Sequence, residues 1–309
     1  MIWGWIEGRF SFLLSLNMIA DNRLLTFDVR ELVDYVISTR SDDGGYCFYR
    51  LKESNAADTF YAVRILMSLR YAVPGPEMTM EFLKNYQGND GSFQSIYMAS
   101  YVLQGLLLLG AQPLFDPYDF IVCHLKSTID ITNHPSYELN DALLEPIGTA
   151  VTLLLLTRGE VPTQLTREIY KAVHPYKRTD GGFGAVHSNV YATYYAMRAV
   201  ATNPVALGTL AGVSNWVRRC EWPSGGFSKT PDNTPNYLDE VYQALYLMRV
   251  TNERPTYIHE TARFIGWLQN ANGGFRRAYD SGISSLENSH YAIKALEELT
   301  YWLMGDVTT

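Results

Sequence analysis

The chain is 309 residues long and 47% of its residues are hydrophobic, so it can bury a large core and is not a disordered protein. Its formal charge is −7 and it contains no run of Lys or Arg, which argues against nucleic acid as the main partner, because phosphate binding needs a basic surface. Aromatic residues make up 13% of the chain, a content that favours an interior surface with flat apolar walls in addition to the core.

Residues 1–27 are predicted to form an N-terminal helical segment that precedes the main fold. The apolar stretch Phe10–Ala20 is too short to span a bilayer, so no transmembrane segment is expected. The three cysteines, Cys47, Cys123 and Cys220, lie far apart and form no CxxC pair, which indicates neither a disulfide framework nor a thiolate zinc site. We therefore expect a cytoplasmic protein.

A turn of two small residues followed by an aromatic residue recurs along the chain. Its clear copies begin at Gly44, Gly91, Gly181, Gly225 and Gly273, at intervals of 47, 90, 44 and 48 residues. The interval of 90 residues is two periods, and its midpoint near position 136 falls in the turn-rich stretch 133–137. A fixed period of this length is typical of repeat architectures, whose units bury their apolar faces only by stacking. The sequence therefore predicts six repeats between about residues 28 and 300.

Each of these turns stands between two helical patterns of different character. The preceding segments, such as 28–40 and 256–269, carry more polar residues, whereas the following segments are apolar nearly all round and contain small residues such as Ala62, Ala196 and Ala292. Glycine ends the first helix because it readily adopts positive φ. We expect the apolar helices to form an inner ring and the polar helices an outer ring. The predicted fold is all-α, an α6/α6 toroid of about six helical hairpins in one domain over residues 1–309.

The repeated Gly-Gly-Phe turn and the inner helix of the type Ala-Thr-Tyr-Tyr-Ala at 192–196 resemble those of protein prenyltransferase β subunits. Squalene–hopene cyclase and related class II terpene cyclases share the same pattern, and the resemblance covers roughly positions 28 to 300. It implies an isoprenoid small molecule as ligand and, for a transferase of the farnesyl type, a separate helical partner subunit. Because one fold can host unrelated chemistry, the function depends on the residues at the site.

The zinc site of the prenyltransferases is incomplete in this sequence. That family places an Asp and a Cys two residues apart at the start of one inner helix and a His at the start of the next. Asp239 stands at the first position, but Val241 occupies the Cys position and Asn288 the His position. Because zinc needs three or four protein ligands, no cofactor is predicted. A rearranged zinc site that uses Asp239 and His290 remains an alternative to a packed, buried His290.

The basic residues that bind a prenyl diphosphate in that family are also missing. They precede the Asp by three and six positions, where this sequence has Asn236 and Asn233, whose amides carry no charge. A basic residue recurs instead six residues into the inner helices, at Arg64, Arg198 and Lys294. Because basic residues favour the C-terminal half of a helix, we expect solvated or helix-end positions for them, with contact to a diphosphate as the alternative.

The acid motif of the class II cyclases is reduced to its last residue. In that family an Asp-rich motif ending in Asp-Thr at the head of an inner helix protonates an alkene or an epoxide. The matching stretch here is 55–59, in which Asp58 and Thr59 remain while Ala57 occupies the position of the proton donor. Asp58 could act as the acid if its pKa were tuned by burial and by partners. The alternative is a helix-start Asp that accepts backbone N–H bonds.

Tyrosines occupy one register in four of the six inner helices. Tyr61, Tyr195, Tyr242 and Tyr291 each follow the helix-start position by three residues, and residues three apart share one face of a helix. If this face points to the centre of the toroid, it provides aromatic walls suited to a polyprenyl chain and to a carbocation. If it points between helices, the tyrosines only pack and donate hydrogen bonds.

The sequence thus predicts an isoprenoid-handling enzyme that is most like prenyltransferase β subunits but has an incomplete zinc site. The candidate catalytic residues are Asp58 and Asp239. The candidate substrate-binding residues are the four tyrosines together with Asn288 and His290. Two alternatives stay open, namely a proton-initiated class II terpene cyclase with an atypical acid, and a noncatalytic toroid for isoprenoid binding or protein assembly.

Overall fold

The computed structural model describes residues 26–48, 53–134, 138–200, 212–231, 233–234, 237–280 and 282–305. In these ranges the secondary structure consists of helices, with isolated β-bridges at the turns. Nearly all of the predicted N-terminal segment 1–27, and residues 135–137 of the predicted third turn, lie outside the described residues. No helix of the described chain is long and apolar enough to cross a membrane.

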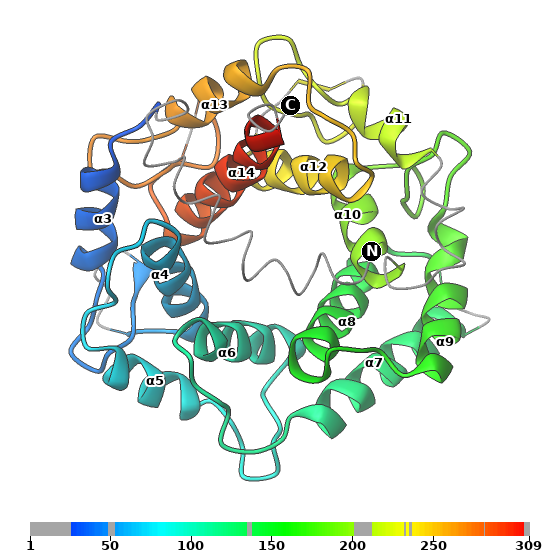
Figure 1. Cartoon of the computed structure of the whole chain (residues 1–309). Coiled ribbons are helices and arrows are strands. Elements are labelled where there is room, and N and C mark those ends of the chain that lie inside the picture. Colours follow the sequence, from blue (N-terminus) through cyan, green and yellow to red (C-terminus); the bar gives the residue numbers. More distant parts are fainter. Residues whose placement is uncertain are drawn as a thin grey trace.

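The helices form two concentric rings (Figure 1). The outer ring consists of α3 (Val29–Ser38), α5 (Pro76–Lys84), α7 (Tyr118–Thr132), α9 (Thr163–Val173), α11 (Val213–Arg218) and α13 (Ile258–Gly266). The inner ring consists of α4 (Ala56–Ser68), α6 (Ile96–Leu108), α8 (Leu144–Arg158), α10 (Val190–Val200), α12 (Leu238–Val250) and α14 (Leu286–Gly305). Two short 3-10 helices, η2 (Asp141–Leu143) and η3 (His174–Tyr176), precede α8 and follow α9. The predicted α/α toroid is confirmed.

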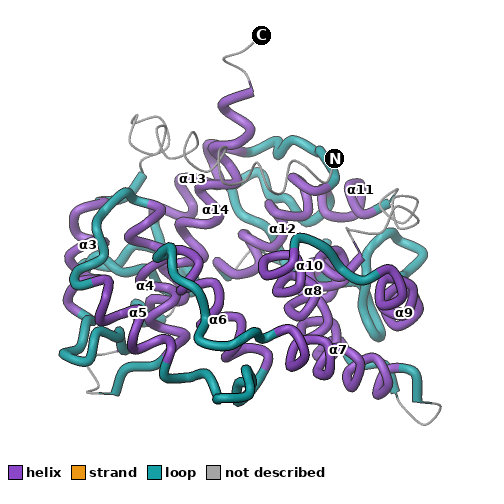
Figure 2. Tube along the Cα trace, turned by 60° about the horizontal axis from the view of Figure 1, so that its bottom comes forward, coloured by secondary structure: helices purple, strands orange, loops and turns teal. Residues whose placement is uncertain are grey.

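The inner ring is closed, because each inner helix contacts the next one and α14 returns to contact α4. Seen from the side, the outer helices flank the inner ones along most of the molecule (Figure 2). Around the ring the order is α4, α6, α8, α10, α12 and α14, so α4 and α10 lie on opposite sides (Figure 1).

The two rings differ in how much of each helix is buried. In the outer helix α3 only Leu32, Val33 and Val36 are buried, and its N-terminus is capped by Asp28, whose side chain accepts from two backbone N–H groups. The inner helix α8 buries ten of its fifteen residues, in keeping with its nearly uniform apolar sequence. Burying each large apolar side chain stabilises the fold by about 1.5–3 kcal/mol, so the core between the rings dominates the stability.

Three of the recurring aromatic turns are fixed to the inner helices by hydroxyl groups. In these three the backbone N–H of the aromatic residue donates to a Thr or Ser near the start of the following inner helix. The pairs are Tyr46 with Thr59, Phe183 with Thr193, and Phe275 with Ser289, each at 3.0 Å. The three aromatic side chains are almost fully buried, so each turn both caps an outer helix and inserts a ring into the core.

The first glycine of the turn allows close contact with the next repeat. Gly225 has φ of +98°, and a Cβ there would overlap the backbone carbonyl of Glu260 in α13. Gly273 of the last repeat has φ of +84°, and a Cβ there would overlap the carbonyl of Glu31 in α3, the outer helix of the first repeat. The same turn that links successive repeats therefore also closes the ring.

Candidate functional site

Acidic side chains occupy the first turn of four inner helices. Asp58 lies in α4, Glu145 in α8, Asp239 and Glu240 in α12, and Glu287 in α14. We call these five residues the acidic rim. The charges of Asp58 and Asp239 both act on Glu287, so the first turns of α4, α12 and α14 lie at the same end of the ring. A carboxylate in the first turn is favoured by the helix dipole, which accounts for the presence of these residues but not for their surroundings.

Asp58 is a half-buried carboxyl group held in one orientation. Its Oδ2 accepts hydrogen bonds from the Asn55 side chain at 2.7 Å and from the Phe48 backbone N–H at 3.0 Å. Burial raises the pKa of Asp58 above its usual value, against the opposing effect of these two hydrogen bonds. Because both donors engage Oδ2, and Oδ1 bonds to no described residue, a proton on this group would be carried by Oδ1.

Tyr61 connects this part of the rim to the interior. Its hydroxyl lies 3.3 Å from the Tyr101 hydroxyl and 3.4 Å from Glu287 Oε1. The ring of His290 packs 5.1 Å from the Tyr61 ring and 5.4 Å from the Phe60 ring, between centroids. Burial, assisted by nearby positive charge, holds the pKa of His290 well below its usual value, so this imidazole is neutral at physiological pH. Its Nδ1 has no hydrogen-bond partner in the described part of the chain.

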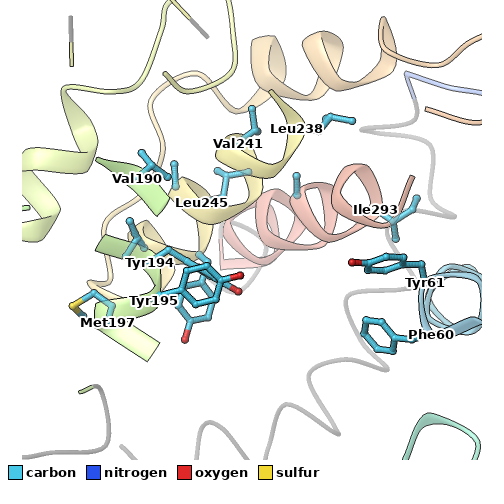
Figure 3. Close-up of a cluster of buried hydrophobic side chains, with 14 of the residues drawn as sticks. Phe60, Tyr61, Val190, Tyr194, Tyr195, Met197, Leu238, Val241, Leu245 and Ile293 are labelled. Carbon is cyan, nitrogen blue, oxygen red and sulfur yellow. The ribbon is translucent and has the colours of Figure 1, made fainter. Parts of the chain in front are cut away.

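A second group of tyrosines lies on the opposite side of the ring. Glu145 accepts from the Tyr195 hydroxyl at 2.7 Å and from the Tyr191 hydroxyl at 2.8 Å. Figure 3 shows Tyr194 and Tyr195 of α10 facing the space from which Phe60 and Tyr61 of α4 approach.

The four tyrosines of the predicted register contribute to this aromatic interior. The Tyr291 hydroxyl is near enough to those of Tyr61 and Tyr195 to raise the pKa of both, after the larger effect of burial. The Tyr242 and Tyr291 rings stack at 5.9 Å, and the Tyr242 hydroxyl lies 3.5 Å from that of Tyr194. The tyrosines thus turn toward the interior and also contact aromatic residues of the neighbouring helices. Their role in substrate binding stays a prediction.

Asp239 and Glu240 lie next to each other in sequence but have different surroundings. The Asp239 carboxylate accepts from Arg277 Nη2 at 3.1 Å and Nε at 3.3 Å. Glu240 is only 7% exposed. Its burial, together with the charge of Asp239, raises its pKa to about 7, while the smaller effects of Lys229 and Arg277 act in the opposite direction. A large fraction of Glu240 is therefore protonated at neutral pH.

The residues at the zinc positions do not form a metal site. Val241 is fully buried in the core beside Leu245 (Figure 3). Asn288 lies in the first turn of α14, where its backbone N–H is held by Ser285. Among the described residues no group of three or more His, Cys, Asp and Glu side chains is placed to hold a metal ion, and Asp239 is engaged by Arg277. These donors do not fit a zinc site, so we derive no step through a metal.

Of the two asparagines at the expected diphosphate positions, Asn233 is exposed in the loop before α12, and Asn236 lies outside the described residues.

A second charged group of the interior lies further along four of the inner helices, α4, α10, α12 and α14. It consists of Arg64, Arg198, Arg249, Lys294, Glu297 and Glu298, which we call the charged floor. Glu297 pairs with Arg64 at 2.9 Å and with Lys294 at 2.8 Å, and Glu298 pairs with Arg249 at 2.7 Å. The Arg64 and Lys294 side chains are 13% and 19% exposed, so the expected solvated positions are wrong for both. The first turns of the inner helices lie together at the rim, and residues further along the same helices lie together on the floor. Neighbouring inner helices are therefore parallel.

Sequence reasoning missed the environment of Glu240 and the tyrosine contacts of Glu145 and Glu287. A signal was present, because each of these residues is an acid within the first turn of an inner helix. Such acids are also common for helix stability alone, and only the packed ring shows which of them meet tyrosines or become buried.

Comparison with known domain families agrees with this closed ring of helices. The model of the prenyltransferase alpha-alpha toroid domain matches residues 8–110 and 147–281, so the chain belongs to that family. No curated protein sequence matches the chain.

Solved structures share the fold at low sequence identity. A chain of Candida albicans protein geranylgeranyltransferase-I complexed with GGPP is 13% identical, with a TM-score of 0.64 over 87% of this chain and 90% of that one. The type II terpene cyclase MstE from Scytonema, as a variant in complex with geranylgeranyl dihydroxybenzoate, is 13% identical, with a TM-score of 0.60 over 94% and 99%. A protein from Actinoplanes is 17% identical, with a TM-score of 0.57 over 88% and 97%. At these identities the likeness concerns the fold.

Proposed function

We propose that this chain is an isoprenoid enzyme that begins its reaction by protonating a carbon–carbon double bond, in the manner of a class II terpene cyclase. The observation that carries the proposal is the acidic rim, in which Asp58 is oriented and has a raised pKa beside the aromatic wall of Tyr61 and Tyr101. Protonating an alkene requires a carboxyl group that is neutral and partly shielded from water.

The electrostatics of the rim disfavour a prenyl diphosphate at this end of the toroid. Four of its carboxyl groups lie on the adjacent helices α12, α14 and α4, and the charges of Asp58 and Asp239 reach Glu287. The cations that act on Glu240 are Lys229 and Arg277, and Arg277 is already bound to Asp239. A diphosphate would meet net repulsion here, so a substrate enters the rim more favourably with its hydrocarbon end.

The proposed first step uses Asp58 as the general acid. The π electrons of the terminal double bond form a new C–H bond with the proton on Oδ1, and the O–H electrons remain on Asp58 as a carboxylate. The substrate becomes a tertiary carbocation, which the faces of Tyr61, Tyr101 and Tyr291 stabilise by cation–π attraction. Internal double bonds then attack the cation to close rings, and loss of a proton from carbon ends the reaction. The product is an isomer of the substrate.

The ligands of the similar structures suggest which length of isoprenoid to test first. The ligands in the similar structures are GGPP for the geranylgeranyltransferase and geranylgeranyl dihydroxybenzoate for the cyclase. Both contain a geranylgeranyl chain, which we therefore choose for this protein.

Product analysis by mass spectrometry tests the proposal. The purified protein is incubated with geranylgeranyl compounds in the presence of EDTA, with and without a thiol acceptor peptide. We expect a cyclised product with the mass of the substrate. Release of diphosphate with prenylation of the peptide, or activity that EDTA abolishes, would refute a metal-independent cyclase and restore the transferase hypothesis with its helical partner subunit.

A noncatalytic isoprenoid-binding toroid is the second candidate. It is favoured by one observation, because the hydrogen bonds of Asp58 to Asn55 and Phe48 also fix the start of α4 and the preceding loop. This structural role would account for Asp58 without chemistry. Binding of a geranylgeranyl probe without any turnover would support this candidate over the cyclase.

A further inference from the structure

Arg198 differs from the other cations of the charged floor because it forms no ion pair with any carboxylate of the described chain. Its Nε and Nη2 donate to Thr152 Oγ1 at 3.1 and 2.7 Å, and its Nη1 donates to the Tyr194 hydroxyl at 3.3 Å. Its guanidinium lies over the Tyr194 and Tyr195 rings, at 5.3 and 5.8 Å from their centroids. A guanidinium has five N–H donors, so two of them are unused within the described chain.

The two carboxylates of the floor are already paired with its other three cations. Glu297 is shared by Arg64 and Lys294, and Glu298 is paired with Arg249. The floor therefore holds four cations and two carboxylates, and among the described residues Arg198 forms no ion pair. A half-buried cation without a counter-ion is unfavourable, and the tyrosine faces compensate for only part of this cost.

A second unsatisfied polar group lies beside Arg198. Tyr246 of α12 is 4% exposed, its ring centroid is 5.0 Å from that of Tyr194, and its hydroxyl has no hydrogen-bond partner among the residues that the structure describes. Burial raises the pKa of this phenol, and the charge of Arg198 is the largest effect that opposes the rise, which places the guanidinium near the hydroxyl. An anion between them would accept from both groups.

We infer that Arg198 and Tyr246 bind the oxyanion headgroup of the isoprenoid substrate, either a carboxylate or a terminal phosphate. Arginine forms charge-assisted hydrogen bonds with both groups, and the free phenol adds a third donor. This inference rests on the proposed function and defines the substrate class as an acidic polyprenyl compound rather than a neutral one.

The position of Arg198 also sets the orientation of the substrate. Arg198 is the ninth residue of α10, and Asp58 is the third residue of α4, on the opposite side of the ring. In parallel helices this difference of six residues separates the two groups by about 9 Å along the ring axis, in addition to the distance across it. A headgroup at Arg198 would therefore direct the hydrocarbon chain diagonally across the ring, with its terminal double bond toward Asp58.

Equilibrium binding tests the site with three probes that share one chain: geranylgeraniol, geranylgeranoic acid and geranylgeranyl diphosphate. We expect wild-type protein to bind at least one acidic probe more tightly than the alcohol. Arg198→Gln should weaken binding of that probe about ten- to a hundredfold, the value of a charge-assisted hydrogen bond, while leaving the alcohol within about twofold. Arg198→Lys should recover part of the loss.

Two further variants separate a binding role from a structural one. Tyr246→Phe should weaken the acidic probe severalfold and leave the melting temperature unchanged or higher, because it removes an unsatisfied buried hydroxyl. Arg158→Gln, which removes a guanidinium paired with Asp116 at the surface, should leave the affinity for all three probes unchanged.

The outcomes distinguish the two proposals. If Arg198→Gln weakens the binding of only the carboxylate probe or only the diphosphate probe, the result supports the site and identifies the headgroup. If the wild type binds all three probes equally, or Arg198→Gln leaves acidic probes unaffected, the headgroup site is refuted while the isoprenoid function stands. If no probe binds, the proposed function fails and the headgroup site fails with it.

Discussion

The acidic rim and the charged floor lie at the two ends of one ring of parallel helices but differ in charge: the rim consists of five acids, whereas the floor has four bases and two acids. Acids in the first turn and bases further along both suit the helix dipole, so this separation of charge is what stable helices produce by default. Residues whose surroundings the helix dipole does not explain therefore say more about function. At the rim, burial raises the pKa of Asp58 and of Glu240. On the floor, Arg198 forms no ion pair within the described ranges, whereas Arg64 and Lys294 share Glu297.

The largest expected effect tests the rim. Asp58→Asn keeps the size of the side chain but removes the transferable proton, so kcat for cyclisation should fall about 10²- to 10⁴-fold. Asp239→Asn is the matched control, because Asp239 is bound by Arg277, and kcat should change by less than about tenfold. Steady-state assays of both variants make the comparison. Equal losses in the two variants would show that Asp58 has no special role.

The next effect tests the floor. Burial alone would raise the pKa of Glu297, but the charges of Arg64 and Lys294 outweigh it and lower the pKa to about 2. Glu297→Gln leaves these cations unpaired and should reduce the free energy of unfolding by about 3–5 kcal/mol at pH 7.

The pH dependence of that loss follows from the lowered pKa. The stability contributed by Glu297 is fully present above its unfolded pKa of 4.5 and is lost as the pH falls toward 2, so the difference should shrink in that range. Urea denaturation from pH 7 to pH 3 measures it. Glu253→Gln, which breaks the exposed pair with Arg218, should cost only about 0–1 kcal/mol. Similar losses in both variants would mean that the floor network is not specially buried.

A third prediction concerns ring closure, on which both ends depend. Gly273→Ala forces a Cβ against the Glu31 carbonyl at positive φ and should cost about 2–4 kcal/mol. Gly110→Ala is the control, because Gly110 also has positive φ, +74°, but a Cβ there meets no atom within 4 Å. Its cost should be about 1 kcal/mol. Thermal denaturation of both variants decides whether the contact between the last and first repeats is tight.

The smallest effect concerns Glu240, whose pKa of about 7 makes its contribution depend on pH. Below pH 4.5 the carboxyl group is protonated in both the folded and the unfolded protein, so it does not affect stability. As the pH rises from 4.5 through 7, the group ionises more readily in the unfolded protein, and the folded state loses stability. Glu240→Gln should therefore be more stable than wild type by about 1–3 kcal/mol at pH 8 and similar to it at pH 4.5. The exposed Glu160→Gln variant should show no such dependence. A constant difference between pH 4.5 and pH 8 would contradict the burial of this carboxyl group.

The fold could be predicted from the sequence because its signals repeat. Gly225 and Gly273 recur with one period, and apolar inner helices follow each turn, so many weak signals add up. The acid candidate Asp58 could be found in the same way from its position at the head of an inner helix. Whether Arg198 has a counter-ion could not be predicted from the sequence, because Glu297 and Glu298 are about 100 residues away along the chain. Only the closed ring shows that these two acids pair with Arg64 and Arg249 instead.

The central claim is that Asp58 starts the reaction by giving a proton to carbon, and labelling in D₂O tests it most directly. Wild-type protein in D₂O should convert a geranylgeranyl substrate to a cyclised product that carries one deuterium on carbon, and Asp58→Asn should form none. A product without deuterium, or a deuterated product formed equally well by Asp58→Asn, would contradict the account.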